Sequence, residues 1–141
     1  MRIAVIDGQG GGIGKSIVEK LRKELPENTE IIALGTNSLA TSFMLKAGAN
    51  EGASGENAIV YNASRVDIII GMIGILISNS MLGELTPAMA KAIAESPAKK
   101  VILPLNRCNI EIIGVDNQPI PHLIDAAIMR IREYIRGEKN V

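Results

Sequence analysis

The chain opens with an apolar segment, a glycine-rich turn and an amphipathic segment in direct succession. Residues Arg2–Ile6 predict a strand, residues Ile13–Leu25 predict a helix, and five glycines occupy the seven positions Gly8–Gly14. Glycines at such a turn let a ligand approach the backbone closely. The following helix N-terminus offers unpaired N–H groups and a partial positive charge that suit a phosphate. The predicted binding residues of this turn are Asp7, Gly8, Gln9, Gly10, Gly11, Gly12, Ile13, Gly14 and Lys15.

Strands and helices alternate along the rest of the chain, which predicts a three-layer Rossmann-like α/β domain. Short apolar runs predict strands at Arg2–Ile6, Glu30–Leu34, Asp67–Ile70, Lys100–Leu105 and Glu111–Val115. Periodic segments predict helices at Ile13–Leu25, Leu39–Ala47, Glu56–Ser64, Pro87–Glu95 and Pro121–Arg136. Residues 50–55 are expected to form a loop. The length of 141 residues fits a single domain.

The connection between the last two predicted strands is too short for a parallel crossover. Only five residues, Asn106–Ile110, separate them, whereas a crossover needs a dozen or more. The segment Glu111–Val115 is therefore expected to turn back as an antiparallel edge strand of a mostly parallel sheet. It follows that His122 is expected on the rim of the sheet opposite the glycine turn.

Several loops are expected to share the rim at the carboxyl ends of the parallel strands, where open α/β sheets bind ligands. Thr36 and Asn37 follow the second strand and can hydrogen-bond a ribose. Arg107 follows the fourth strand, and its guanidinium can pair with a phosphate or a carboxylate. The predicted site therefore adds six residues to the turn, the last two on condition that their helix faces it: Thr36, Asn37, Asn106, Arg107, Glu56 and Asn57.

The charge and cysteine content exclude several classes of partner. Lys plus Arg equals Asp plus Glu, at fifteen each, so no field of one sign favours nucleic acid or an anionic membrane. The most apolar run, residues 68–77, is too short to span a bilayer, and the N-terminus has no signal-peptide pattern. The single cysteine, Cys108, fits a reducing compartment, so a cytoplasmic location is expected. One cysteine and one histidine offer no recognised ligand spacing, and no metal is expected.

The apolar content predicts self-association. Apolar residues make up 47% of the chain, and the segment Met72–Leu82 is apolar on nearly every side. A helix of this kind is either buried or placed at an interface. A homodimer or a higher even multiple that uses this segment is therefore expected.

The spacing Gly-x-x-x-Gly-Ile-Gly within Gly8–Gly14 resembles the cofactor loop of the short-chain dehydrogenase/reductase family, over the first thirty-odd residues only. The resemblance implies NAD(P) or another nucleotide at the turn. The family's Tyr-x-x-x-Lys pair is missing, because Tyr61 is followed four residues later by Arg65. Thr36–Asn37 stands where dinucleotide sites usually carry an acid for the ribose. Hydride transfer is therefore not supported.

The same turn also resembles a P-loop through Gly14–Lys15–Ser16. Gln9 stands where that motif needs its first glycine, and no acid for Mg²⁺ ends a second apolar strand. If the backbone of the turn contacts phosphate, Gly12→Val and Gly14→Val are both expected to fold and to lose the ligand.

Over nearly its full length the chain resembles a family of short bacterial proteins classed only as a domain of unknown function. The segments that carry this resemblance are Asp7–Lys15, Ala33–Asn37, Gly55–Ala58 and Asn106–Asn109. It implies no established activity.

Three functions are compatible with these residues, and no catalytic residue is assigned. The first is a binding or regulatory module for a nucleotide or another phosphorylated small molecule. The second is a small enzyme, NAD(P)-linked or P-loop-like, whose site is completed across a subunit interface by Asp7, Lys15, Glu56 and Arg107. The third is a scaffold protein without a ligand. The role of Asp7 is open, since its carboxylate can bind a ligand or accept hydrogen bonds from its own loop.

Overall fold

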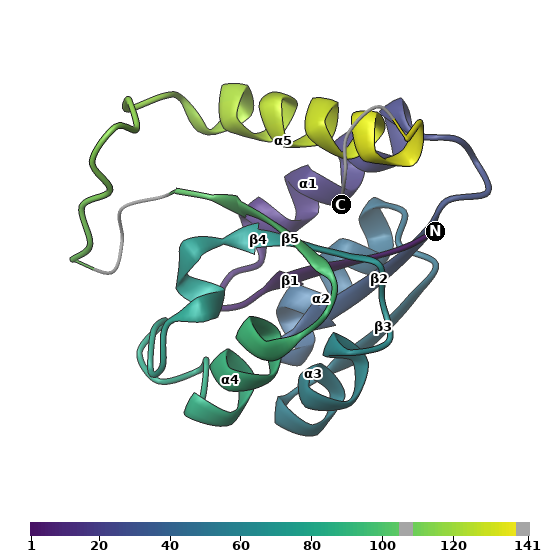
Figure 1. Ribbon diagram of the computed structural model, residues 1–141. Coiled ribbons are helices and arrows are strands. Elements are labelled where there is room, and N and C mark those ends of the chain that lie inside the picture. The colour runs from purple at the N-terminus through teal and green to yellow at the C-terminus, as the bar shows by residue number, and fades with distance from the viewer. Residues whose placement is uncertain (105–108, 138–141) are drawn as a thin grey trace.

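The computed structural model describes residues 1–104 and 109–137, and its centre is a parallel β-sheet. The order of the strands in the sheet is β3-β2-β1-β4-β5, and every neighbouring pair is parallel (Figure 1). The strands are β1 (Arg2–Asp7), β2 (Glu30–Gly35), β3 (Glu51–Ser54), β4 (Ile68–Met72) and β5 (Lys99–Leu103). The strand order reverses between β1 and β4, and in doubly wound folds this switch point is the ligand crevice.

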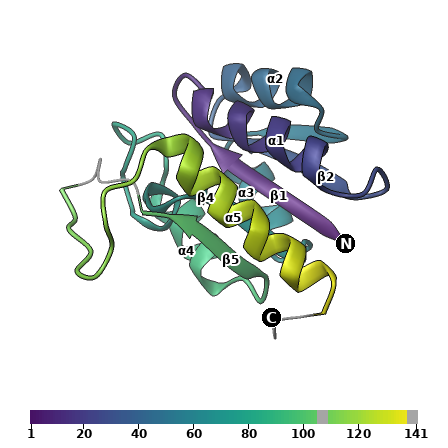
Figure 2. The same ribbon diagram turned by 90° about the horizontal axis from the view of Figure 1, so that it is seen from above.

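Helices cover both faces of the sheet, so the predicted three-layer Rossmann-like class is confirmed. One face carries α1 (Gly12–Glu24), α2 (Ser38–Ala47) and α5 (Ile120–Ile135), as Figure 2 shows. The other face carries α3 (Glu56–Ala63), α4 (Pro87–Glu95) and the short 3₁₀ helix η1 (Ile73–Leu76).

The central strands supply a core on each side of the sheet. In β1, Ile3 and Val5 pack towards α1 and α5, whereas Ala4 and Ile6 pack towards α3 and α4. Successive side chains of a strand point to opposite faces. A strand that is buried on both faces is therefore a continuous apolar run, and this explains why the pattern of residues 2–6 could be identified from the sequence.

The predicted antiparallel edge strand is wrong. Residues 111–115 form an exposed irregular connection, and Ile113 is 86% exposed. At the edge of the sheet, the described strand next to β2 is β3, which pairs with β2 in parallel. β3 lies within residues 50–55, which were expected to form a loop. Its sequence, Glu-Gly-Ala-Ser, has little β-propensity. Gly52 allows α2 to approach, because a Cβ there would lie 2.8 Å from Thr41 Cγ2.

His122 lies on the same rim of the sheet as the glycine turn, which corrects the second expectation that followed from the hairpin. Two ion pairs show that α1 and α5 run in the same direction: Lys20 pairs with Asp125 at 3.0 Å, and Glu24 pairs with Arg132 at 3.7 Å. The described part of the connection, residues 109–119, leads into α5 and forms no strand. The first turn of α5, with His122, therefore begins on the rim where α1 begins.

The segment Met72–Leu82 is not the apolar helix that was expected. It continues from β4 through η1 into a series of turns, in which Asn79, Met81 and Leu82 have positive φ angles. Ile75 is fully buried in the core of this chain, so this part of the segment is not available to an interface. Leu82, by contrast, is 98% exposed.

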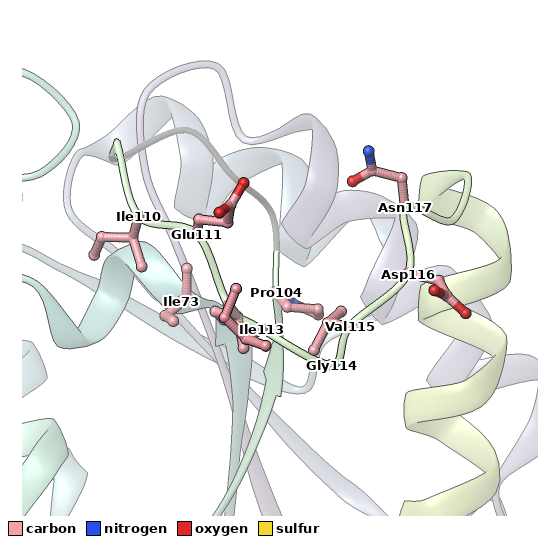
Figure 3. Close-up of a pocket in the computed structure, with 10 residues that line it drawn as sticks. Ile73, Pro104, Ile110, Glu111, Ile113, Gly114, Val115, Asp116 and Asn117 are labelled. Carbon is pink, nitrogen blue, oxygen red and sulfur yellow. The ribbon is translucent and has the colours of Figure 1, made fainter.

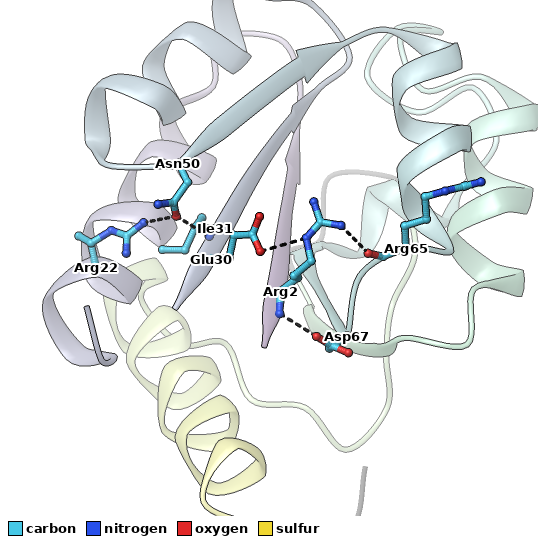
Figure 4. A network of polar contacts seen from close by, with 7 residues as sticks. All are labelled: Arg2, Arg22, Glu30, Ile31, Asn50, Arg65 and Asp67. Atoms are coloured by element: carbon cyan, nitrogen blue, oxygen red, sulfur yellow. Dashed lines mark hydrogen bonds and ion pairs between the residues drawn. The ribbon is translucent and has the colours of Figure 1, made fainter. Parts of the chain in front are cut away.

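A polar network closes the rim at the amino ends of the strands (Figure 4). The Arg2 amide donates to Asp67 Oδ2 at 2.7 Å, and the Arg2 guanidinium lies 3.2 Å from Glu30. On the neighbouring strand, Asn50 Oδ1 accepts hydrogen bonds from Arg22 and from the Ile31 amide.

No helix in the described part of the chain is both long enough and apolar enough to cross a membrane.

Candidate functional site

The five glycines of the turn fall into two structural groups. Three are required by packing or backbone conformation. A Cβ at Gly8 would lie 2.3 Å from Thr36 Oγ1, a Cβ at Gly14 would lie 2.8 Å from Asp7 Cβ, and Gly11 has a φ of +73°. A Cβ at Gly10 or Gly12 would meet nothing within 4 Å. The expectation that Gly14→Val folds normally is therefore wrong, because valine there would collide with β1.

The hydrogen bonds of the turn leave part of the α1 N-terminus open. Lys15 N donates to Gly11 O at 3.0 Å, and Gly14 N donates to Asp7 Oδ2 at 2.6 Å. The amides of Gly12 and Ile13 make no hydrogen bond to any described residue. The first amides of a helix have no intrahelical partner, so these two donors are available to a bound group.

Asp7 is the side-chain cap of its own loop. Its side chain is buried, and the residue is only 4% exposed. The carboxylate accepts the Gly14 amide and so occupies the favourable electrostatic position at the positive end of the helix dipole. Of the two roles that the sequence left open, the loop-capping role is the one that this contact supports.

Glu84 joins the glycine turn to the end of β2. Its Oε1 atom accepts hydrogen bonds from the Gln9 amide at 2.8 Å, the Thr36 hydroxyl at 2.6 Å and the Asn37 side-chain amide at 2.8 Å. Asn37 also caps α2, because its Oδ1 atom accepts the Ala40 amide. Gln9 has a φ of +49°, a conformation that is costly for a residue with a side chain, and the Glu84 contact holds it there.

Sequence analysis did not identify Glu84 as a member of the site. It lies 75 residues from Gln9 and 48 from Thr36, in the connection between η1 and α4. The residues of that connection follow neither a strand nor a helix period, so their pattern does not predict the direction of the Glu84 side chain. The available signal was weak: an acid directly after Gly83 and shortly before the Thr86–Pro87 helix start.

The contacts of Glu84 lower its pKa below the ordinary value of 4.5. The Thr36 hydroxyl is the main cause, partial burial opposes it, and the Gln9 and Asn37 donors add to the lowering. A carboxyl group with a depressed pKa in the folded state contributes stability above its unfolded pKa, and this contribution is lost as the pH falls through the folded pKa.

Glu84→Gln is accordingly expected to lower the free energy of unfolding by about 1 kcal/mol at neutral pH, because neutral hydrogen bonds replace charge-assisted ones. The difference between wild type and variant should shrink as the pH falls below 4.5. Urea denaturation of both proteins from neutral to acidic pH measures it. A difference that stays constant with pH would show that the charge of Glu84 is not involved.

A cavity of about 410 Å³ lies one strand away from the glycine turn (Figure 3). Ile73, which follows β4, and Pro104, which follows β5, form its base, and the connection of residues 110–117 forms its wall. The register pairs Val5 with Ile70, so the ends of β1 and β4 lie at the same level on the rim. Pockets of this volume hold small molecules and cofactors.

The chain belongs to the family described as Domain of unknown function (DUF3842), whose family model matches residues 2–136. A search of the curated proteins gives no match.

Solved structures share the fold of this DUF3842 chain at low sequence identity. One is a dodecameric FMN-dependent UbiX-like decarboxylase from Escherichia coli O157:H7, with 12% identity and a TM-score of 0.51 over 96% of this chain and 94% of that one. At this identity the likeness concerns the fold. AibC is also similar to part of this chain, with 17% identity and a TM-score of 0.49 over 89% of this chain and 32% of that one, and no conclusion about the fold rests on it.

The remaining predicted site residues of this DUF3842 chain lie apart from the turn or outside the described residues. Glu56 and Asn57 are exposed at the start of α3, on the same rim but beyond β2, where Gly55 N bonds to Gly35 O. Neither makes a hydrogen bond to the described part of the turn. Asn106 and Arg107 lie outside the described residues. The structure thus brings together the Asp7–Lys15 turn, Thr36, Asn37 and Glu84.

Proposed function

We propose that this chain binds a nucleotide or another phosphorylated small molecule at the glycine turn, as a binding or regulatory module. The observation that carries the proposal is the open face at Gly10 and Gly12. Packing and backbone conformation account for Gly8, Gly11 and Gly14, whereas nothing in the described fold requires the other two to lack a side chain. A ligand that contacts the backbone closely explains why both positions lack a side chain.

The charges at the turn favour a phosphate as the contacting group. The amides of Gly12 and Ile13 have no partner among the described residues, and they lie at the positive end of the α1 dipole. Lys15 adds a cation in the first turn of the helix, and its side chain is about half exposed, 4.0 Å from Glu19. The Asp7 carboxylate is buried and already accepts the Gly14 amide.

The cavity beside β4 and β5 supports a ligand larger than phosphate alone. It lies at the carboxyl ends of β4 and β5, one strand away from the glycine turn, on the rim where open α/β sheets bind ligands. Ile73 and Pro104 supply apolar contacts within a lining that is mostly polar, which suits a ligand that combines a ring with polar groups. FMN is one of the phosphorylated small molecules that the proposal covers, and the UbiX-like structure is described as FMN-dependent.

Calorimetric titration with pyrophosphate, FMN, NAD⁺, NADP⁺ and ATP tests the proposal. At least one nucleotide is expected to bind more tightly than pyrophosphate, because it adds contacts in the cavity or at the end of β2. Pyrophosphate is expected to compete with that nucleotide, because both use the turn. If no compound of the panel binds, or if a nucleotide binds without competition from pyrophosphate, the turn is not the phosphate site.

We also infer that the chain is a single domain that self-associates as a homodimer or a higher even multiple. Large apolar side chains at two places on the described surface support this inference: Leu82 is 98% exposed and Ile113 is 86% exposed. Both follow strands that end on the rim of the proposed site. If copies of the chain bring these side chains together, they form a contiguous apolar patch of the kind that marks a contact surface.

A further inference from the structure

The Glu84 carboxylate has one fixed oxygen and one open oxygen. Three donors from two different loops hold Oε1. Oε2 makes no hydrogen bond to a described residue, and it is not among the buried side-chain atoms that lack a partner, so it is accessible to solvent. The side chain is therefore immobilised by one atom while the other remains a positioned acceptor with a negative charge.

This acceptor lies at the end of β2, next to the glycine turn. In folds with this strand order, a carboxylate at the end of the second strand binds the ribose hydroxyls of a nucleotide whose phosphate lies at the turn. The local chain supplies Thr36 and Asn37 there, and both of them donate to Glu84. The carboxylate that β2 lacks is thus provided by the connection between η1 and α4.

We propose that Glu84 determines the ligand class of the site: its Oε2 accepts a hydrogen bond from the ribose 2′-hydroxyl of a nucleotide that carries no 2′-phosphate. This inference rests on the proposed function, since it assumes a phosphate at the turn. Every donor to Glu84 belongs to Gln9, Thr36 or Asn37. The amides of Gly12 and Ile13 are not among them, so the contacts that hold Glu84 leave these two donors without a partner among the described residues.

A 2′-phosphate would be rejected for two reasons. It replaces a hydroxyl that donates a hydrogen bond with a group that is a dianion near neutral pH. It also places this charge against a carboxylate whose own three hydrogen bonds hold it in position. The pair NAD⁺ and NADP⁺, which differ only in the 2′-phosphate, therefore isolates the contribution of Glu84.

Calorimetry with pyrophosphate, NAD⁺ and NADP⁺ on the full chain tests this inference. Wild type is expected to bind NAD⁺ at least about tenfold more tightly than NADP⁺. A site that hydrogen-bonds a ligand hydroxyl disfavours an analogue that lacks this hydroxyl. Glu84→Gln is expected to remove most of this preference, which is read as the ratio of the NAD⁺ and NADP⁺ affinities of the same protein, so that a change of the Gln9 turn that affects both nucleotides alike cancels. Glu27→Gln, an equal charge change at an exposed position after α1, is expected to leave the preference intact.

Three outcomes overturn the inference and are distinct from failure of the proposed function. If pyrophosphate binds wild type but NAD⁺ and NADP⁺ bind equally well, the site exists and Glu84 does not select the ligand. If Glu84→Gln or Glu84→Ala binds NAD⁺ more tightly than wild type does, the carboxylate obstructs the ribose. If both variants keep the tenfold preference and have a wild-type circular dichroism spectrum, another group selects the ribose. Absence of binding for all three compounds contradicts the proposed function itself.

Discussion

Gly12→Val is expected to abolish phosphate binding in a protein that folds like wild type. Gly12 is the first residue of α1, its φ is not positive, and a Cβ there meets no atom within 4 Å. A valine side chain would instead occupy the space in front of the Gly12 and Ile13 amides. Pyrophosphate affinity should fall at least about tenfold, or about 1.4 kcal/mol, with a thermal midpoint close to that of wild type. Calorimetry and thermal denaturation measure the two quantities.

Gly14→Val is the matched contrast to this variant, with the same substitution two residues further along the helix. A Cβ at Gly14 would lie 2.8 Å from Met44 Sδ and 2.9 Å from Asp7 Oδ2, so valine there disturbs both the core and the cap of the loop. Its thermal midpoint should fall strongly. If Gly12→Val instead binds pyrophosphate like wild type, the open glycines do not mark a ligand site. If both variants are equally destabilised, the two groups of glycines are not distinct.

The three-layer fold could be predicted because burial on both faces leaves a pattern in the sequence. The runs that became β1, β2, β4 and β5 are apolar, and α1 and α5 show their helical period. The edge of the sheet left no such pattern. β3 forms from Glu-Gly-Ala-Ser because β2 offers it a partner and α2 packs over Gly52, whereas residues 111–115 look like a strand but find no partner in the described fold.

The same distinction applies to the site. The Asp7–Lys15 turn, Thr36 and Asn37 could be found because each follows a strand whose direction the alternating pattern defines. Glu84 could not, since it reaches the turn through a connection in left-handed conformations at Asn79, Met81, Leu82 and Gly83. The cavity was missed for a related reason: its wall, residues 110–117, was assigned to a strand and its turn.

Ile75→Asp is expected to prevent folding, whereas Leu82→Asp is expected to leave the fold intact. Ile75 is 0% exposed and packs in the core on the side of α3 and α4. A carboxylate at that position loses its hydration and gains no partner, which costs several kcal/mol in addition to the lost apolar burial. A domain has only about 5–15 kcal/mol of stability in total. Circular dichroism of the purified variants measures the difference.

Leu82→Asp then tests the assembly separately from the fold, because a side chain that is 98% exposed contributes little to the core. If copies of the chain meet through this part of the rim, light scattering should show wild type at a multiple of 15.0 kDa and the variant at a smaller mass. A folded variant with the wild-type mass places the contact elsewhere, and Ile113→Asp is then the next variant to compare. A wild-type monomer at micromolar concentration excludes self-association, and the apolar side chains of the rim would then face the ligand or solvent alone.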